Sequence, residues 1–72
     1  MKKIYINTEI IKLDSFLKFC GAVGTGGEGK IAIIEGLVSV NGEVCYQRGK
    51  KLKDKDTVTF NNETYEVCKN WR

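Results

Sequence analysis

The sequence contains no histidine and no proline in 72 residues, and only three cysteines. Without histidine, the chain cannot build a Ser/His or Cys/His nucleophilic pair, nor a Cys/His zinc site. Three cysteines are too few for an all-cysteine zinc site, and no two of them form a C-x-x-C pair. These absences exclude much hydrolytic and zinc chemistry, so we expect a protein that is not an enzyme and has no metal or cofactor.

The cysteines, Cys20, Cys45 and Cys68, are odd in number and are not accompanied by a secretory signal pattern. This usage is typical of reduced thiols in the cytoplasm, and we expect small, buried, hydrophobic side chains without a redox role. No apolar run approaches the roughly 18 residues of a membrane span. The sequence therefore predicts a cytoplasmic protein with no membrane contact.

The length indicates one domain, residues 1–72, with a small core, because so short a chain removes only about 60% of its unfolded surface from water. Apolar residues make up 42% of the chain and charged residues 29%, which is typical of a folded domain.

The first predicted elements are a strand at residues 2–7 and a helix at residues 14–20. The strand has alternating β-branched and aromatic residues. The helix has Asp14 in position to cap its free backbone N–H groups. Gly21 follows as a stop, because glycine adopts the left-handed conformation found beyond helix ends.

A second predicted helix opens at Thr25 and ends at Gly36. Thr25 and Glu28 have the spacing of a capping box, in which each side chain satisfies a backbone N–H near the other residue. We expect the apolar face of this helix to consist of Ile31, Ile33 and Ile34.

A hairpin is predicted around Asn41 and Gly42, since Asn-Gly between alternating apolar residues is a strong turn pattern. A plain two-residue turn would place Glu43 on the face of Val40. One bulged residue would place Val44 on that face instead. We favour the bulge, because it keeps one face of the hairpin apolar.

The remaining chain contains a polar loop at 47–55 anchored by Leu52, strands at 56–60 and 63–68, and a tail of Trp71 and Arg72. We expect most aromatic side chains in the core. The order of elements predicts an α+β fold, in which two short helices pack on one face of an antiparallel sheet of four to five strands.

The segment 24–30 matches both G-x-G-x-x-G and the start of a phosphate-binding loop. A nucleotide site is not expected, because Ile31 stands where the loop needs Ser or Thr and the chain cannot supply the parallel sheet. A nucleic-acid phosphate could still bind at this helix start. The groups that would hold it are the N–H groups of Thr25, Gly26 and Gly27 together with Lys30.

The net charge of +3 comes entirely from the last third of the chain. Five basic side chains crowd into eight residues: Arg48, Lys50, Lys51, Lys53 and Lys55. Such a run is often only a solvated loop that protects a sheet edge. We favour nucleic-acid binding, because a concentrated basic stripe on an otherwise neutral domain is its usual electrostatic footprint.

Three segments in this order resemble the RNA-binding domain named after ribosomal protein S-four. They are K-L-D-S-F-L at 12–17, T-G-G-E-G-K at 25–30 and I-I-E-G-L-V-S-V-N-G-E at 33–43, and the resemblance covers about residues 12–60. The chain looks like a small stand-alone member of this family. Two positions depart from the family pattern: Gly26 stands where many members have arginine, and Gly29 where they often have alanine.

The resemblance implies an RNA-binding surface formed by the two helices, an αL motif, and the adjoining loop. Carried onto this chain, its candidate residues are Lys12, Lys18, Thr25, Lys30, Arg48, Lys50, Lys51 and Lys53. Lys30 lies one turn after Gly26 and is the candidate to replace the missing arginine.

The sequence thus predicts a monomeric, cytoplasmic protein that binds structured RNA, ribosomal or transfer, in connection with the ribosome or translation. The alternative is a protein-interaction adaptor or homo-oligomer that uses its sheet face and Trp71, with an incidental basic loop. The two differ in the surface they require, since the adaptor needs an exposed apolar patch and RNA binding a basic one.

Overall fold

The computed structural model of the chain describes residues 1–70, so the predicted tail of Trp71 and Arg72 lies outside the described residues. The elements in chain order are β1 (Lys2–Ile6), β2 (Ile11–Lys12), α1 (Leu13–Phe19), α2 (Gly26–Ile34), β3 (Val38–Val40), β4 (Glu43–Val44), β5 (Lys51–Leu52), β6 (Thr57–Phe60) and β7 (Glu63–Lys69).

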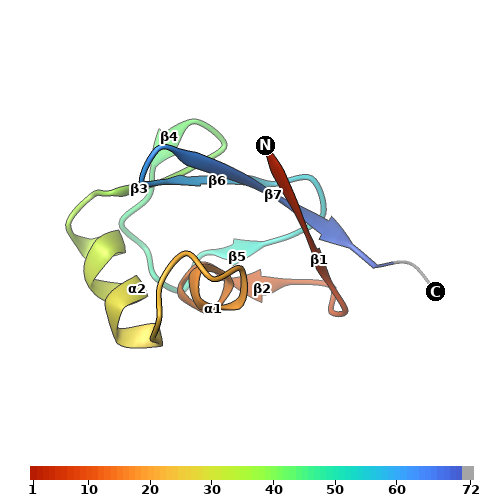
Figure 1. Cartoon of the computed structure of the whole chain (residues 1–72), viewed down its shortest axis with the longest axis horizontal. Helices are drawn as coiled ribbons and strands as arrows, with labels where there is room; N and C mark the ends of the chain where they lie inside the picture. Colours follow the sequence, from red (N-terminus) through yellow and green to blue (C-terminus); the bar gives the residue numbers. More distant parts are fainter. Residues whose placement is uncertain (71–72) are drawn as a thin grey trace.

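The strands form one five-stranded sheet in the order β1-β7-β6-β3-β4 and one separate pair, β2-β5. The helices and the β2-β5 pair lie on one side of the larger sheet (Figure 1), which confirms the predicted α+β class. The sheet is mixed rather than antiparallel, because β1 runs parallel to β7. Parallel neighbours require a long crossover connection, which the helices and inner strands between β1 and β7 provide.

The core lies between the sheet and the helices and contains Phe16, Leu17, Ile33, Val38 and Leu52, among others, all fully buried. Burial of Leu52 confirms it as the anchor of the basic loop. The loop also contains the two-residue strand β5, which was not expected.

The aromatic residues are less buried than expected. Phe16 and Tyr65 are buried and meet edge-to-face, with ring centroids 6.4 Å apart. By contrast, Tyr5, Phe19 and Tyr46 are each more than half exposed. The expectation that most aromatics are core residues is therefore wrong for these three.

Helix α1 starts one residue earlier than predicted, and Asp14 does not occupy its N-cap position, although Asp14 Oδ1 accepts from the backbone N–H of Ser15 (2.7 Å). Lys12 occupies the N-cap position and makes no side-chain capping bond. The free N–H groups of Leu13 and Asp14 donate instead to the backbone carbonyls of Lys50 (2.8 Å) and Arg48 (3.1 Å). A backbone segment distant in sequence thus caps this helix, and a local sequence pattern cannot reveal such a cap.

The capping box of α2 is confirmed. The Glu28 N–H donates to Thr25 Oγ1 (3.1 Å), and Glu28 Oε1 accepts from the N–H of Thr25 (3.3 Å) and, more closely, from that of Gly24 (2.7 Å). The helix ends before Gly36, which has φ +79°.

The predicted apolar face of α2 is wrong at two of three positions. Ile33 is fully buried, whereas Ile31 and Ile34 are 59% and 63% exposed. The buried residues of the helix are Gly29, Ala32 and Ile33, with Gly29 against Asp14 and Leu17 of α1, so the other two isoleucines point away from the core.

The β3-β4 hairpin has a plain two-residue turn, so the predicted bulge is wrong. Val40 pairs directly with Glu43. Asn41 (φ 52°) and Gly42 (φ 88°) are both left-handed, which is the backbone conformation that matches the twist of paired strands. The apolar face is continued by Cys45, whose N–H donates to the carbonyl of Val38 (3.0 Å).

Candidate nucleic-acid interface

The short pair β2-β5 brings two distant lysines together. Lys12 on β2 is the direct cross-strand partner of Lys51 on β5, and both side chains are exposed. The neighbouring pair, Ile11 and Leu52, packs toward the core and holds the two strands in register. Like charges placed directly opposite each other repel and disfavour strand pairing. A bound anion would reduce the repulsion between these two lysines.

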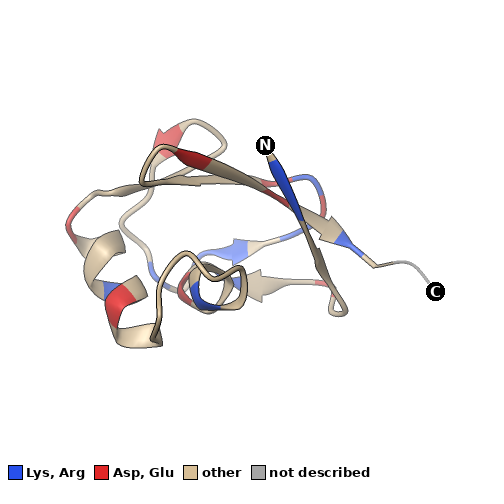
Figure 2. Ribbon diagram, in the orientation of Figure 1, with Lys and Arg blue, Asp and Glu red and all other residues tan. Residues whose placement is uncertain are grey.

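The backbone bonds that cap α1 place Arg48 and Lys50 at the same point. Their carbonyls accept from the first N–H groups of α1, directly after Lys12. Both side chains are exposed. We call Lys12, Arg48, Lys50, Lys51 and Lys53 the basic cluster. Figure 2 shows the basic segment β5 on the helical side of the molecule, across from the larger sheet.

Buried Asp56 fixes the far end of the basic cluster. Its carboxylate accepts from the backbone N–H of Lys53 (2.9 Å) and from the side-chain amide of Asn41 (3.1 Å). Lys53 Nζ lies 3.7 Å from the same carboxylate. Burial acts to raise the pKa of Asp56, but these hydrogen bonds and the charges of Lys53 and Lys50 outweigh it and hold the pKa below its ordinary value.

The other members of the cluster are not neutralised by the fold. Within residues 1–70, no ion pair forms at Lys12, Arg48, Lys50 or Lys51. Exposed bases without acidic partners are available to phosphate oxygens.

The start of α2 is less open to an anion than the sequence indicated. The Glu28 carboxylate already occupies the N–H of Thr25 and brings a negative charge to this helix end. Of the three predicted N–H groups, those of Gly26 and Gly27 make no hydrogen bond within residues 1–70. Lys30 is exposed one turn further along α2.

Lys18 lies in the last turn of α1, at the opposite end of that helix from the basic cluster. The structure therefore brings together the predicted bases Lys12, Arg48, Lys50, Lys51 and Lys53, and it leaves Lys18 and the start of α2 as separate positions. The pairing of Lys12 with Lys51 was missed, because a two-residue strand has too little pattern to be recognised.

The cysteines show no features of a reactive or metal site. Burial raises the pKa of the Cys20 and Cys68 thiols, which keeps them protonated at neutral pH. All three cysteines are free and half-buried. Among residues 1–70, no group of three Cys, Asp or Glu side chains could hold a metal ion, and no helix is long and apolar enough to cross a bilayer.

Comparison with known proteins gives consistent matches. Residues 4–68 match the family described as S4 domain. A Bacillus subtilis (strain 168) protein named "Probable ribosome maturation protein RlbA" is 42% identical over 55 residues, 76% of this chain and 78% of that protein.

Two solved structures share the fold. YbcJ from E. coli, whose solution structure was described as revealing an αL motif involved in RNA binding, is 30% identical; the match covers 94% of this chain and 87% of that one, with a TM-score of 0.72. The 30S ribosomal protein S4e of Thermoplasma acidophilum, 19% identical, matches over 83% of this chain and 32% of its own, with a TM-score of 0.63. The match over residues 4–68 confirms the resemblance seen in the sequence: the chain belongs to the S4 domain family.

Proposed function

We propose that this protein binds folded RNA through the basic cluster, as a monomer and without catalysing a reaction. The observation that supports this most directly is the opposition of Lys12 and Lys51, beside Arg48 and Lys50, with no ion pair at any of these four bases within residues 1–70. A fold that keeps like charges in register on a rigid strand pair gains from binding an anion there.

The cluster recognises backbone geometry rather than base sequence. Side chains cannot read the deep, narrow major groove of A-form RNA, so a rigid basic surface responds to the spacing of phosphates. Lys12 and Lys51 are fixed by strand register, and Arg48 and Lys50 by backbone bonds to α1. The spacing of their backbone attachment points is therefore set before RNA arrives, so no backbone ordering is needed on binding.

The RNA we propose is ribosomal RNA, with transfer RNA as the other structured candidate, and the setting is ribosome maturation or translation in the cytoplasm. The name of the Bacillus subtilis relative supports a ribosomal setting, and the description of YbcJ supports RNA binding by this fold. Secondary contacts are proposed at Lys18 and at the start of α2, through Lys30, the Thr25 hydroxyl and the N–H groups of Gly26 and Gly27.

The test is the double variant Lys50→Ala/Lys51→Ala, titrated against a folded ribosomal-RNA hairpin. Both side chains are exposed, and the capping bonds use the Lys50 backbone, so the variant keeps its fold while RNA binding weakens at least tenfold. Lys3→Ala, at an exposed residue of β1, is the matched control and retains wild-type affinity. Unchanged binding by the double variant would show that the basic cluster is only a solvated loop.

A second candidate function, contact with a protein or another copy of the chain, is favoured by one observation. Five apolar side chains between residues 31 and 46 are each 49–65% exposed: Ile31, Ile34, Leu37, Val44 and Tyr46. The ring of Tyr46 lies against Gly36, where an added Cβ would be 3.1 Å from it. Exposed apolar patches of this kind often mark interfaces.

This candidate is tested by light scattering across a range of protein concentrations. A mass that stays at 8.1 kDa at all concentrations supports the monomer. A mass that rises with concentration in the wild type, but not in Ile34→Lys, would show that these exposed apolar side chains mediate self-association.

A further inference from the structure

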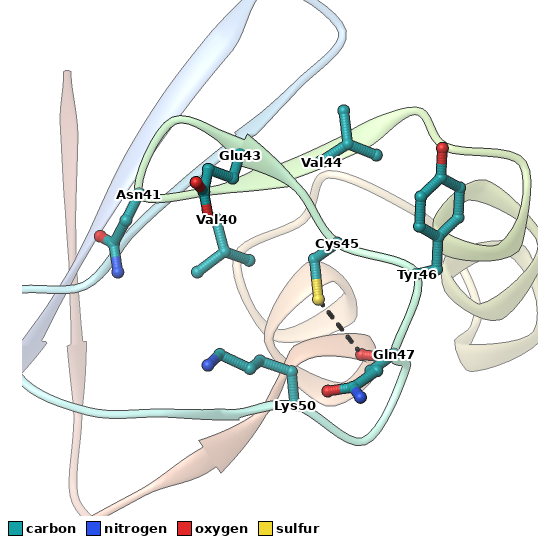
Figure 3. A pocket seen from close by; sticks show the side chains of 8 residues that line it. All are labelled: Val40, Asn41, Glu43, Val44, Cys45, Tyr46, Gln47 and Lys50. Carbon is teal, nitrogen blue, oxygen red and sulfur yellow. Dashed lines mark hydrogen bonds between the residues drawn. The ribbon is translucent and has the colours of Figure 1, made fainter.

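An open pocket of about 460 Å³ lies between the β3-β4 hairpin and the loop that leads to β5. The residues that line it are Val40, Asn41, Glu43, Val44, Cys45, Tyr46, Gln47 and Lys50 (Figure 3). Lys50 belongs both to this pocket and to the basic cluster. The pocket is therefore continuous with the surface proposed to bind RNA.

The inner wall of the pocket is apolar. Val40 is only 7% exposed, and Cys45 packs against the core. In Figure 3 both side chains point from the hairpin toward the loop, and the Cys45 thiol donates to the carbonyl of Gln47 (3.7 Å). A flat, partly apolar group would remove this wall from water.

Three polar groups at the rim are open to a ligand, although the positive charge of Lys50 also acts on the Asp56 carboxylate. The Glu43 carboxylate, the Gln47 side-chain amide and the Lys50 ammonium make no hydrogen bond or ion pair within residues 1–70. The Asn41 amide differs, because it bonds to Asp56 (3.1 Å) and Thr57 (2.9 Å). Asn41 therefore fixes the wall of the pocket, while the other three groups are free for a ligand.

From this geometry we propose that the pocket takes an unpaired guanine base of the bound RNA, an inference that rests on the proposed function. The Glu43 carboxylate only accepts hydrogen bonds and repels phosphate, so its ligand must bring N–H donors. Guanine offers two adjacent N–H donors on its Watson–Crick edge, and each other base offers fewer there. Unstacked bases read on that edge are the usual means of sequence recognition in RNA.

The remaining rim groups complement the same base and its nucleotide. Gln47 carries two amide donors suited to a guanine carbonyl oxygen, and Lys50 carries a positive charge suited to the adjoining phosphate. Glu43 is thus the specificity-determining residue, and Lys50 connects the pocket to backbone binding.

The experiment compares a fully paired RNA hairpin with the same hairpin carrying one bulged nucleotide, G, A, C or U. Wild-type protein binds the bulged-G hairpin about tenfold more tightly than the paired one, the scale of one good bidentate contact. Glu43→Gln loses that preference and retains wild-type affinity for the paired hairpin. Glu35→Gln, at the exposed C-cap residue of α2, is the matched control and keeps the preference.

A second readout uses 5′-GMP and 5′-AMP with the isotopically labelled protein. GMP shifts the backbone amide resonances of Cys45 and Gln47, and AMP does not. If all five hairpins bind equally and neither nucleotide shifts these resonances, the pocket proposal is overturned and the proposed function stands. If no hairpin binds but GMP shifts the resonances of Cys45 and Gln47, the proposed function is wrong and the proposal that the pocket binds guanine is supported. Equal preference for all four bulges overturns the assignment to guanine.

Discussion

Lys12 and Lys51 face each other across the two-residue antiparallel pair β2-β5. The apolar pair beside them, Ile11 and Leu52, holds the strands together, so the two positive charges cannot move apart along the backbone. The fold thus accepts an unfavourable contact at the place where we propose that RNA binds. A bound anion reduces this repulsion. The two lysines therefore lower the stability of the free protein and raise its affinity for RNA.

The first prediction follows from this opposition. Lys51→Ala removes the repulsion, so the free energy of unfolding of the free protein stays constant or rises by up to about 0.5 kcal/mol. RNA affinity falls in the same variant. Urea denaturation and an RNA titration measure the two effects, and a loss of more than about 1 kcal/mol would contradict the account of this strand pair.

The second prediction concerns acid stability through Asp56. Its pKa lies below the ordinary value of 3.8 in the folded protein, so its carboxylate stabilises the fold fully above that pH. The stabilisation is lost as the pH falls from 3.8 through the lower folded pKa. Thermal unfolding across acidic pH will show a smaller drop in stability for Asp56→Asn than for wild type.

The same variant also loses stability at neutral pH, by about 1–3 kcal/mol, because the amide cannot satisfy both donors from Lys53 and Asn41. Glu35→Gln is the control, since Glu35 is exposed and makes no hydrogen bond through its side chain within residues 1–70. If stability falls with pH to the same extent in Asp56→Asn and in wild type, Asp56 is not the source of the acid sensitivity.

The third prediction tests the close approach of the helices at Gly29. An added Cβ would lie 3.3 Å from the backbone carbonyl of Asp14, a contact that a backbone atom cannot easily relieve. Gly29→Ala gains up to about 1 kcal/mol of helix propensity and loses a similar amount to crowding, so it is nearly neutral. Gly29→Val costs about 1–3 kcal/mol.

Gly27 provides the contrast, because an added Cβ there meets only the Thr25 hydroxyl, at 3.8 Å. Gly27→Ala stabilises the protein by up to about 1 kcal/mol in thermal unfolding. If alanine changes the stability equally at Gly27 and Gly29, close packing of Gly29 against α1 does not limit substitution there.

The fourth prediction uses two neighbouring isoleucines on α2. Ile33 is fully buried and Ile34 is 63% exposed. Ile33→Ala costs about 2–5 kcal/mol in denaturant unfolding, and Ile34→Ala changes stability by less than about 0.5 kcal/mol. Similar losses at both positions would show that the Ile34 side chain is covered in solution.

The features found from sequence were those specified by neighbouring residues. The Thr25/Glu28 capping box and the Asn41-Gly42 turn depend on spacing and on backbone preference, and both are present. The family resemblance was visible for the same reason, because its three segments are short local patterns.

Features set by distant contacts were missed. Asp14 has the chemistry of an N-cap, but carbonyls of the 48–50 segment satisfy the N–H groups of Leu13 and Asp14, and the Asp14 carboxylate accepts only from the N–H of Ser15. Ile31 and Ile34 fit a helical face, but the position of α1 decides which face is buried. The hairpin register followed the turn geometry, because Cys45 supplied the apolar contact for which a bulge was expected.

The central claim is that preorganised bases bind folded RNA, and salt dependence tests it most directly. We would titrate the protein by fluorescence anisotropy against a folded ribosomal-RNA hairpin and a matched DNA duplex at about 50 and about 200 mM salt. The account predicts preference for RNA and an affinity that falls about 500-fold between these conditions, as expected for about five phosphate contacts. An affinity independent of salt, or equal binding to RNA and DNA, would contradict it.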